Sequence, residues 1–333
     1  MPEPTPAPDP AGGPDGGRPV PSAPPVEDPR VTVVVASMNR RDELLASLGR
    51  HRAPVVLVDN GSSDGTVEAV RAAHPHVEVV PLPANRGAAA RTVGVRHART
   101  PFVAFADDDS WWAPGSLRTA ADALDAHPTV AVVQASVLVG PEERPDPFDE
   151  VLAGSPLGPR TAPLPGPRVL GFVACAAIVR RDAFLAVGGF DDVVRFPGEE
   201  ERVAWDLTSA GWDLVHLPAA VVHHHPSPRR HSPARRVRAI TRSAVLTGVL
   251  RLPARDAAAR VARALVGAEA TGATRLGLLD AVRDLPRAVR GRRTTTPDVL
   301  HDLAVLTGRP DGDVARPNRP APRTAPRHGG DAA

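Results

Sequence analysis

Over residues 31–139 the chain alternates short apolar runs with segments whose apolar residues recur at helical spacing. The runs are rich in valine, as in strands that are buried on both faces of a parallel sheet. This β-α-β order predicts an α/β fold in which helices flank both faces of a mostly parallel sheet. The apolar runs cover residues 31–36, 55–58, 77–80, 102–106 and 130–139. Later in the chain, residues 172–179 predict a further apolar strand, and residues 214–217 and 220–225 predict two short strands.

Composition excludes several classes of function. The 333 residues include 40 basic and 38 acidic ones, a net charge of +2, and every basic residue is an arginine. This near balance argues against binding along a polyanion, so we expect no nucleic-acid partner. The single cysteine, Cys175, excludes an internal disulfide and a multi-cysteine metal site. It lies in an apolar run, where we expect a buried, inert thiol.

Shifts in composition divide the chain into four segments. Residues 1–29 and 309–333 are rich in proline and are predicted to be disordered tails. Residues 30–228 carry the α/β pattern. Residues 229–308 turn to arginine and alanine with helical patterning, which predicts a basic helical extension. Within the α/β segment, residues 140–168 are irregular and are predicted to form a mobile lid or binding loop.

The sequence predicts a cytoplasmic protein. The N-terminus lacks the basic and then apolar stretch of a signal peptide. The longest uncharged apolar runs are shorter than the roughly 20 residues that span a bilayer. One basic amphipathic segment contains Arg235, Arg236, Arg238 and Arg242. It either packs on the α/β domain or contacts the inner face of the plasma membrane peripherally.

Three adjacent carboxylates, Asp107, Asp108 and Asp109, directly follow the apolar run 102–106. In an extended segment the first and third side chains point the same way, so both could bind one divalent ion. Their oxygens suit Mg²⁺ or Mn²⁺ that bridges to substrate phosphates. An acidic loop of this kind can also be merely solvated. Ligands of such sheets bind beyond the carboxyl ends of strands, however, and this position favours a metal site.

A second polar loop, from Asp59 to Thr66, follows the run 55–58. Asp59 could accept a hydrogen bond from a nucleobase or a ribose hydroxyl. The loop could equally be a turn whose Asp64 caps the next helix. No Walker-type loop occurs, and no Gly-x-Gly-x-x-Gly follows the first run, which disfavours P-loop and dinucleotide-binding functions.

Taken in order, these motifs resemble the family 2 glycosyltransferases of the GT-A fold, which have a Rossmann-like sheet. The resemblance spans residues 30–228 and rests on the ordered set, because each motif alone is weak. The set comprises residues 31–39, the loop 58–66, Asn85-Arg86-Gly87, Phe105-Ala106-Asp107-Asp108-Asp109, Gly188-Gly189-Phe190-Asp191, Gly198-Glu199-Glu200, Gly211-Trp212 and Val222-His223-His224-His225.

The resemblance implies a metal-dependent, inverting transfer from a nucleoside-diphosphate sugar to a hydroxyl acceptor, such as a cell-surface glycan or a lipid-linked saccharide. It implies Mn²⁺ or Mg²⁺ as the cofactor, held by Asp107 and Asp109, with Asp108 nearer the ribose. The residues that it implies for the donor nucleotide are Ala36 and Ser37 through their backbone, Asp59, Asn85, Arg86 and Arg91.

The resemblance also implies a general base at the pair Glu199 and Glu200. Glu200 aligns with the family's usual aspartate, and its longer side chain leaves Glu199 as the alternative. Acids here could instead favour an exposed helix N-terminus. His224 aligns with a metal-ligand position, whereas His223 and His225 would share the other face of a strand. All three histidines could also be exposed.

Two other functions are weighed against this one. A sugar-phosphate nucleotidyltransferase would need a glycine-rich basic loop after the first run, and residues 36–41 lack it. A non-catalytic module that binds nucleotide sugars or glycans would have lost the base, but Glu199 and Glu200 are both present.

Overall fold

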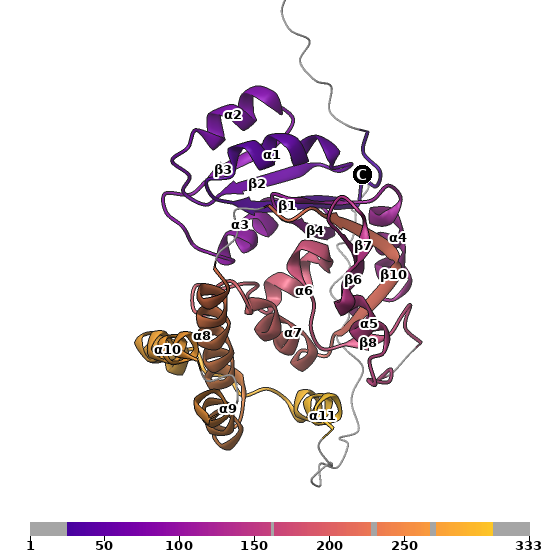
Figure 1. Ribbon diagram of the computed structural model, residues 1–333. Helices are drawn as coiled ribbons and strands as arrows, with labels where there is room; N and C mark the ends of the chain where they lie inside the picture. The colour runs from indigo at the N-terminus through magenta and orange to yellow at the C-terminus, as the bar shows by residue number, and fades with distance from the viewer. Residues whose placement is uncertain (1–24, 161–162, 228–231, 267–270, 309–333) are drawn as a thin grey trace, which may run out of the picture.

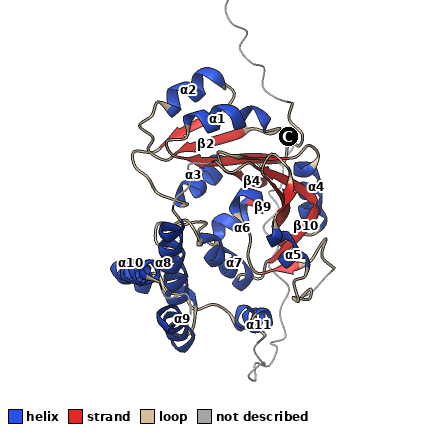
Figure 2. Cartoon of the chain, in the orientation of Figure 1, coloured by secondary structure: helices blue, strands red, loops and turns tan. Residues whose placement is uncertain are grey.

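The computed structural model describes residues 25–160, 163–227, 232–266 and 271–308. A curled sheet with helices on both faces forms one part of the molecule, and a group of helices, α8 to α11, lies beside it (Figure 1). Figure 2 shows that this second part contains helices and loops without a strand among the described residues.

Ten strands form one mixed sheet in the order β3-β2-β1-β4-β9-β6-β10-β5, with β7 beside β6 and β8 beside β10. β3, β2, β1 and β4 are parallel, and the antiparallel β9 separates β4 from β6 and β10, which run in the same direction as β4. The carboxyl ends of the parallel strands therefore share one edge, as predicted for a mostly parallel sheet. The strands are β1 Val31–Ser37, β2 Val55–Asp59, β3 Glu78–Pro81, β4 Phe102–Ala106, β5 Ser110–Trp112, β6 Val130–Val139, β7 Arg144–Pro145, β8 Arg168–Val169, β9 Ala177–Arg180 and β10 Asp213–His224.

The helices bury two separate apolar cores, one on each face of the sheet. α1, α2 and α4 cover one face, and α3, α6 and α7 cover the other (Figure 1). The helices are α1 Arg41–Ser47, α2 Thr66–Ala73, α3 Ala89–His97, α4 Ser116–Ala126, α5 Pro147–Ala153, α6 Arg181–Ala186, α7 Glu199–Ser209, α8 Pro233–Arg251, α9 Ala254–Val266, α10 Gly272–Arg290 and α11 Pro297–Leu306, with short 3-10 turns η1 Leu48–Arg50 and η2 Ala174–Ala176.

Helix α3 approaches the sheet closely at Gly94. A Cβ atom at this position would lie 2.5 Å from Cγ1 of Val34 and 3.0 Å from Cγ2 of Val58. The absence of a side chain therefore lets the helix pack directly on β1 and β2, which sets where its N-terminal end meets the edge of the sheet.

Two predicted strand boundaries differ from those observed. The run 172–179 was expected to be one strand, but it begins with the turn η2 before β9. Two short strands were expected at 214–217 and 220–225, and they form the single strand β10, whose register with β6 shifts between Leu217 and Val221. Pro218 lies in this interval and has no N–H to donate to a neighbouring strand, so a bulge can form without a break in β10.

The described parts of the segment 140–168, for which we predicted a mobile lid or binding loop, are attached to the sheet domain at both ends. Asp149 accepts a hydrogen bond from the backbone N–H of Val137, and β8 at the other end pairs with the start of β10. Arg168 donates to both carboxylate oxygens of Asp302 in α11, at 2.6 and 2.7 Å. These contacts anchor both ends of the segment.

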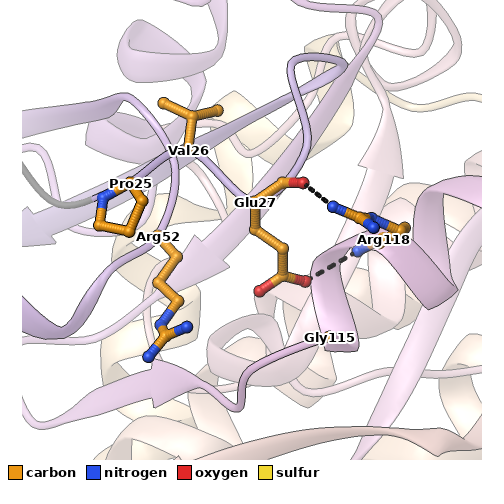
Figure 3. A pocket seen from close by; sticks show the side chains of 6 residues that line it. All are labelled: Pro25, Val26, Glu27, Arg52, Gly115 and Arg118. Atoms are coloured by element: carbon orange, nitrogen blue, oxygen red, sulfur yellow. Dashed lines mark hydrogen bonds between the residues drawn. The ribbon is translucent and has the colours of Figure 1, made fainter.

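Residues 25–29 are the described part of the predicted N-terminal tail, and they pack against the start of α4. The backbone N–H of Glu27 donates to the carbonyl of Arg52, and Arg118 donates to both the carbonyl and the carboxylate of Glu27. A shallow open hollow lies between these groups (Figure 3). The remaining predicted tail residues, 1–24 and 309–333, lie outside the described part of the chain.

The predicted basic extension is helical and packs on the sheet domain through α7. Arg251 of α8 forms an ion pair with Asp206 of α7, and Arg260 of α9 with Glu201, at 2.7 Å. Within the described ranges, no helix has both the length and the apolar character needed to cross a membrane.

Candidate active site

The three aspartates form the turn between β4 and β5, at the carboxyl edge of the sheet. The turn is fixed by the hydroxyl of Ser110, which accepts a hydrogen bond from the backbone N–H of Asp107 at 2.8 Å. The side chain of Asp109 points toward the end of β10. Its Oδ1 lies 3.4 Å from Nε2 of His224, and its Oδ2 accepts from the backbone N–H of Ser227 at 2.9 Å.

The three consecutive histidines of β10 and its end separate onto two sides. His224 faces Asp109, whereas His223 and His225 contact the carboxylate of Glu143 at 2.6 and 3.1 Å. The rings of His223 and His225 also contact Trp111, at 5.4 and 4.7 Å between centroids. The alternation that we predicted for a strand is present, and only His224 lies on the side of the aspartates.

Asp108 is half-buried and accepts a hydrogen bond from the hydroxyl of Ser37, at the end of β1, at 2.6 Å. Burial, against the lowering effect of the serine and with the charges of Asp107 and Asp109, raises the pKa of Asp108 to about 6. The predicted nucleotide residue Ser37 and the predicted ribose residue Asp108 are therefore in direct contact. Ala36 precedes Ser37 in β1 and pairs with Val58 of β2.

A buried arginine joins two of the predicted acidic groups. Arg91 of α3 donates to Oδ1 of Asp107 at 2.5 Å and lies 3.4 Å from Oε1 of Glu199. The Glu199 side chain is fully buried, and its Oε2 has no hydrogen-bond partner among the described residues. Burial, and then the neighbouring charge of Glu200, hold the pKa of Glu199 well above its usual range, while Arg91 acts in the opposite direction.

Glu200 has different surroundings although it is the next residue. It is half-buried, and its Oε1 accepts a hydrogen bond from the backbone N–H of Ala174 in η2 at 3.4 Å. Cys175 follows in the same turn and is buried, and burial followed by the charge of Asp107 raises the pKa of its thiol well above the usual range. This agrees with the expected inert thiol, although Cys175 lies in a turn beside the site and not in a strand.

The polar loop after β2 is organised by Asp59 and Asn60. Oδ2 of Asp59 accepts from the backbone N–H of Ser62 at 3.0 Å, while its Oδ1 is buried without a partner in the described part of the chain. Asp64 accepts from the backbone N–H of Thr66 at 3.1 Å, so both interpretations of this loop, a turn and a nucleotide contact, are compatible with its geometry.

Asn60 lies in the loop 58–66, where no role is predicted for it, and its side chain connects two loops in the structure. Its amide donates to the carbonyl of Gly87 at 3.1 Å and accepts from the backbone N–H of Arg86 at 2.7 Å. It thereby joins the loop after β2 to the loop before α3. The turn propensity of an asparagine beside a glycine indicated the loop but not this distant partner.

The loop before α3 holds the remaining predicted nucleotide residues. Asn85 accepts from the backbone N–H of Gly87 at 2.7 Å, which closes the loop on itself. The guanidinium of Arg86 points away from it to Asp192, at 2.6 Å. This ion pair connects the start of α3 to the segment that precedes α7 and its two glutamates.

Comparison with known proteins adds to this geometry. Residues 32–188 match the family model described as glycosyl transferase family 2. The N-acetylglucosaminyl-diphospho-decaprenol L-rhamnosyltransferase of Mycobacterium tuberculosis is 30% identical over 243 residues, which cover 62% of this chain and 78% of that protein. The pre-mycofactocin glycosyltransferase of the same species is 36% identical over 219 residues, 61% of this chain. The match covers only 44% of that longer relative.

Two solved structures show the same fold. One is the mannosyltransferase PcManGT from Pyrobaculum calidifontis in complex with GDP-Man and Mn²⁺, with a TM-score of 0.52 and 22% identity, over 87% of this chain and 89% of that one. The other is S. aureus TarS 1–349, with a TM-score of 0.52 and 18% identity, over 78% and 81%. They confirm the predicted α/β fold of the GT-A type. The family model and the rhamnosyltransferase match, together with the ordered motifs, show that this chain belongs to glycosyltransferase family 2.

Proposed function

We propose that this chain transfers a sugar, with inversion at the anomeric carbon, from a nucleoside-diphosphate sugar to a hydroxyl of a glycan or lipid-linked acceptor. The observation that carries the proposal is the gathering of Asp107, Asp108 and Asp109 with His224 and Glu200 at one edge of the sheet. Electrostatic stabilisation of the leaving diphosphate and removal of the acceptor proton both require such groups.

Asp109 and His224 fit part of a site for a divalent cation, whereas the described residues hold no ready group of three ligands, because Asp107 pairs with Arg91. Asp109 and His224 already lie 3.4 Å apart, and Asp107 is on the same turn. Carboxylate oxygens with one imidazole nitrogen suit Mn²⁺ and also accommodate Mg²⁺. When bound, the ion would neutralise charge that develops on the leaving diphosphate. PcManGT carries Mn²⁺ with its donor, which supports the same cofactor here.

Glu200 is the better candidate for the base. Glu199 is fully buried and faces Arg91, so its carboxylate cannot approach an acceptor hydroxyl. Glu200 is half-buried and is oriented by the N–H of Ala174. We propose that the acceptor proton passes to a Glu200 oxygen while the acceptor oxygen bonds to the anomeric carbon. The bond from that carbon to the diphosphate oxygen breaks in the same displacement.

The nucleotide would bind across β1, β2 and the loop before α3. The unpartnered Oδ1 of Asp59 can accept an N–H from a base or a ribose hydroxyl. Ser37 and Asp108, with Ala36 beside them, are in position to meet the ribose, and Asn85, Arg86 and Arg91 border the same edge of the sheet. The solved relatives bind different nucleotides, since PcManGT holds GDP-Man and TarS has been solved with UDP.

The acceptor that we favour is lipid-linked. One relative is named for transfer to N-acetylglucosaminyl-diphospho-decaprenol, whose decaprenol is a lipid. We propose that the protein is cytoplasmic, that it contacts the inner face of the plasma membrane peripherally, and that it acts in the assembly of a cell-envelope polysaccharide.

The test is release of nucleoside diphosphate from UDP-, GDP- and dTDP-sugars with Mn²⁺, Mg²⁺ or EDTA. We expect metal-dependent turnover with at least one donor, and a loss of about 100-fold or more in Asp107→Ala and Asp109→Ala, since electrostatic groups of this kind contribute that much. Asp182→Asn, on the outside of α6 with a side chain 80% exposed, is the matched control and should keep full activity. Unchanged turnover in both alanine variants would refute the proposal.

A further inference from the structure

An apolar groove of about 560 Å³ lies between α8, α9 and α10. Its walls include Val245 and Val249 from α8 and Leu279 and Val282 from α10. Both α10 side chains are strongly exposed, at 65% and 64%. The groove is therefore an open, apolar face of the helical part of the molecule, and α8, which carries one wall, also packs on α7.

Other large apolar side chains of the same helices are exposed. Leu265, which also lines the groove, and Val266 at the end of α9 are 55% and 83% exposed, and Leu276 and Val289 on α10 are 46% and 56% exposed. Exposed apolar side chains in this number are typical of a surface that binds a partner.

The charge around this surface identifies the kind of partner. The described carboxylates of α10, Asp280 and Asp284, are already paired with Arg238 and Arg242 of α8, each at 2.6 Å. The other described acid of these three helices, Asp256, lies beside Arg255. Exposed arginines of α8, α9 and α10 for which the described ranges show no ion pair within 4 Å are Arg235, Arg236, Arg263, Arg275, Arg283 and Arg290, of which Arg283 is also attracted by Asp280.

An apolar groove with Arg275 in its wall, on helices that carry further exposed arginines, fits anionic lipid headgroups above an acyl layer. A second copy of this chain fits less well, because two such faces would bring like charges together. The observations therefore favour a lipid surface over self-association.

The same helix connects this surface to the candidate active site. Ser243 of α8 donates to the carbonyl of Arg195, and Arg242 donates to the carbonyl of Val193, at 2.8 and 2.9 Å. These carbonyls lie in the segment that leads into α7 at Gly198, where a Cβ would approach Ser243 to 3.2 Å. The position of Glu200 is thus fixed relative to the apolar face.

We propose that α8, α9 and α10 form a docking surface for an anionic lipid bilayer, with the apolar side chains in the headgroup region and the arginines at the phosphates. The surface would hold the site next to an acceptor that is anchored in the bilayer by its lipid. The surface gives a structural basis to the membrane contact in the proposed function. The choice of acceptor rests on the proposed sugar transfer, whereas docking itself does not.

Co-sedimentation of the full chain with phosphatidylcholine vesicles, with and without phosphatidylglycerol, tests docking. We expect binding that requires phosphatidylglycerol and weakens with salt. Arg275→Glu with Arg283→Glu should weaken it by roughly fivefold or more for each arginine changed. Leu279→Asp with Val282→Asp should weaken it at least tenfold. The matched control is Val151→Asp on α5, a position 66% exposed that is outside the three helices and should bind as the wild type does.

Three outcomes would overturn the proposal: no binding by the wild type, equal loss in Val151→Asp, or unchanged binding in both double variants. Light scattering in the same buffers tests the alternative partner, a second copy of this chain. A dimer that Leu279→Asp with Val282→Asp dissociates, without vesicle binding, would assign this face to self-association and also overturn it. Donor hydrolysis without vesicles should be normal in every variant. Vesicle binding by a wild type that hydrolyses no donor would therefore sustain docking while the proposed function failed.

Discussion

At the scale of single residues, adjacent acids in this chain have opposite environments. Glu199 is enclosed with Arg91, while Glu200 reaches the turn that contains Ala174 and Cys175. The helix start explains the difference, because successive residues of a helix point about 100° apart. Two carboxylates side by side in sequence can therefore serve different roles.

Glu200→Gln should lower sugar transfer by roughly 10²- to 10⁴-fold, because the amide cannot take the acceptor proton. Binding of the nucleoside diphosphate should be unchanged, as calorimetry can check. Glu201→Gln is the control, since Glu201 is one residue further on and pairs with Arg260 away from the site. Full activity of Glu200→Gln would exclude Glu200 as the base.

The raised pKa of Asp108 predicts that the stability of the fold depends on pH. Its folded pKa, about 6, is above the ordinary 3.8, so between these values the folded chain holds a proton that the unfolded chain releases. The free energy of unfolding should therefore fall as pH rises through this window, by at most about 3 kcal/mol from this group.

Urea unfolding of the wild type and Asp108→Asn, at about pH 4 and about pH 6.5, measures this contribution. From the lower to the higher pH, the free energy of unfolding of the wild type should fall relative to that of Asp108→Asn. Ser37→Ala should make the fall in the free energy of unfolding larger, because the serine hydrogen bond lowers the pKa of Asp108 and its loss would raise that pKa. A difference that is constant with pH would contradict the assignment.

At the scale of elements, the position of α3 depends on a single missing side chain. Gly94→Ala would place a Cβ 2.5 Å from Val34. The expected cost of overpacking is about 1–3 kcal/mol, partly offset by up to about 1 kcal/mol of better helix propensity. Thermal or urea unfolding should show net destabilisation. Gly272→Ala at the start of α10, where nothing lies within 4 Å of the added Cβ, should show none. Equal effects would refute the close approach.

Much of the sheet could be predicted because its valine-rich runs are buried on both faces and have no competing local structure. The exact start of β9 could not be predicted from the sequence. The backbone leaves the sheet at η2 because the side chains of Gln134 and Glu200 accept the N–H groups of Val173 and Ala174. Such partners are distant in sequence and leave no signal in the periodicity of the run.

The candidate site was predictable to a similar extent. The place of Asp107 and Asp109 at the edge of the sheet could be predicted because they follow a buried strand, and that of His224 because it lies in an ordered set of motifs; their roles stay predictions. The ion pair of Arg91 with Glu199 joins residues 108 positions apart, and neither residue type nor spacing indicates it. The role of Asn60 as a bridge between two loops was missed for the same reason.

At the scale of the whole molecule, α11 closes the fold onto the segment 140–168. Asp302 is 2% exposed and accepts from Arg160 and, through both oxygens, from Arg168. Its loss would leave buried arginines without their carboxylate. The sequence predicted a mobile lid or binding loop here because prolines and glycines indicate loops, and its spacing gave no sign of a buried ion pair with a helix near the other end of the chain.

Asp302→Asn should lower the free energy of unfolding by roughly 3–5 kcal/mol, the cost of breaking a buried pair from one side. Urea unfolding is the measurement. Asp256→Asn is the control, because its partner Arg255 has a side chain 89% exposed, and surface pairs contribute about 0–1 kcal/mol. Similar effects of the two substitutions would show that α11 is not held by this pair.

The acidic turn after β4 is argued to hold a diphosphate through a divalent cation that Asp107 and Asp109 share with His224. Calorimetric titration of UDP, GDP and dTDP, with Mn²⁺ and with EDTA, measures the affinity for the nucleoside diphosphate without any turnover. At least one nucleotide should bind only with Mn²⁺, and Asp109→Asn should weaken that binding tenfold or more while Asp182→Asn leaves it unchanged. Equal affinity in Mn²⁺ and EDTA, and in Asp109→Asn and the wild type, would contradict the shared cation.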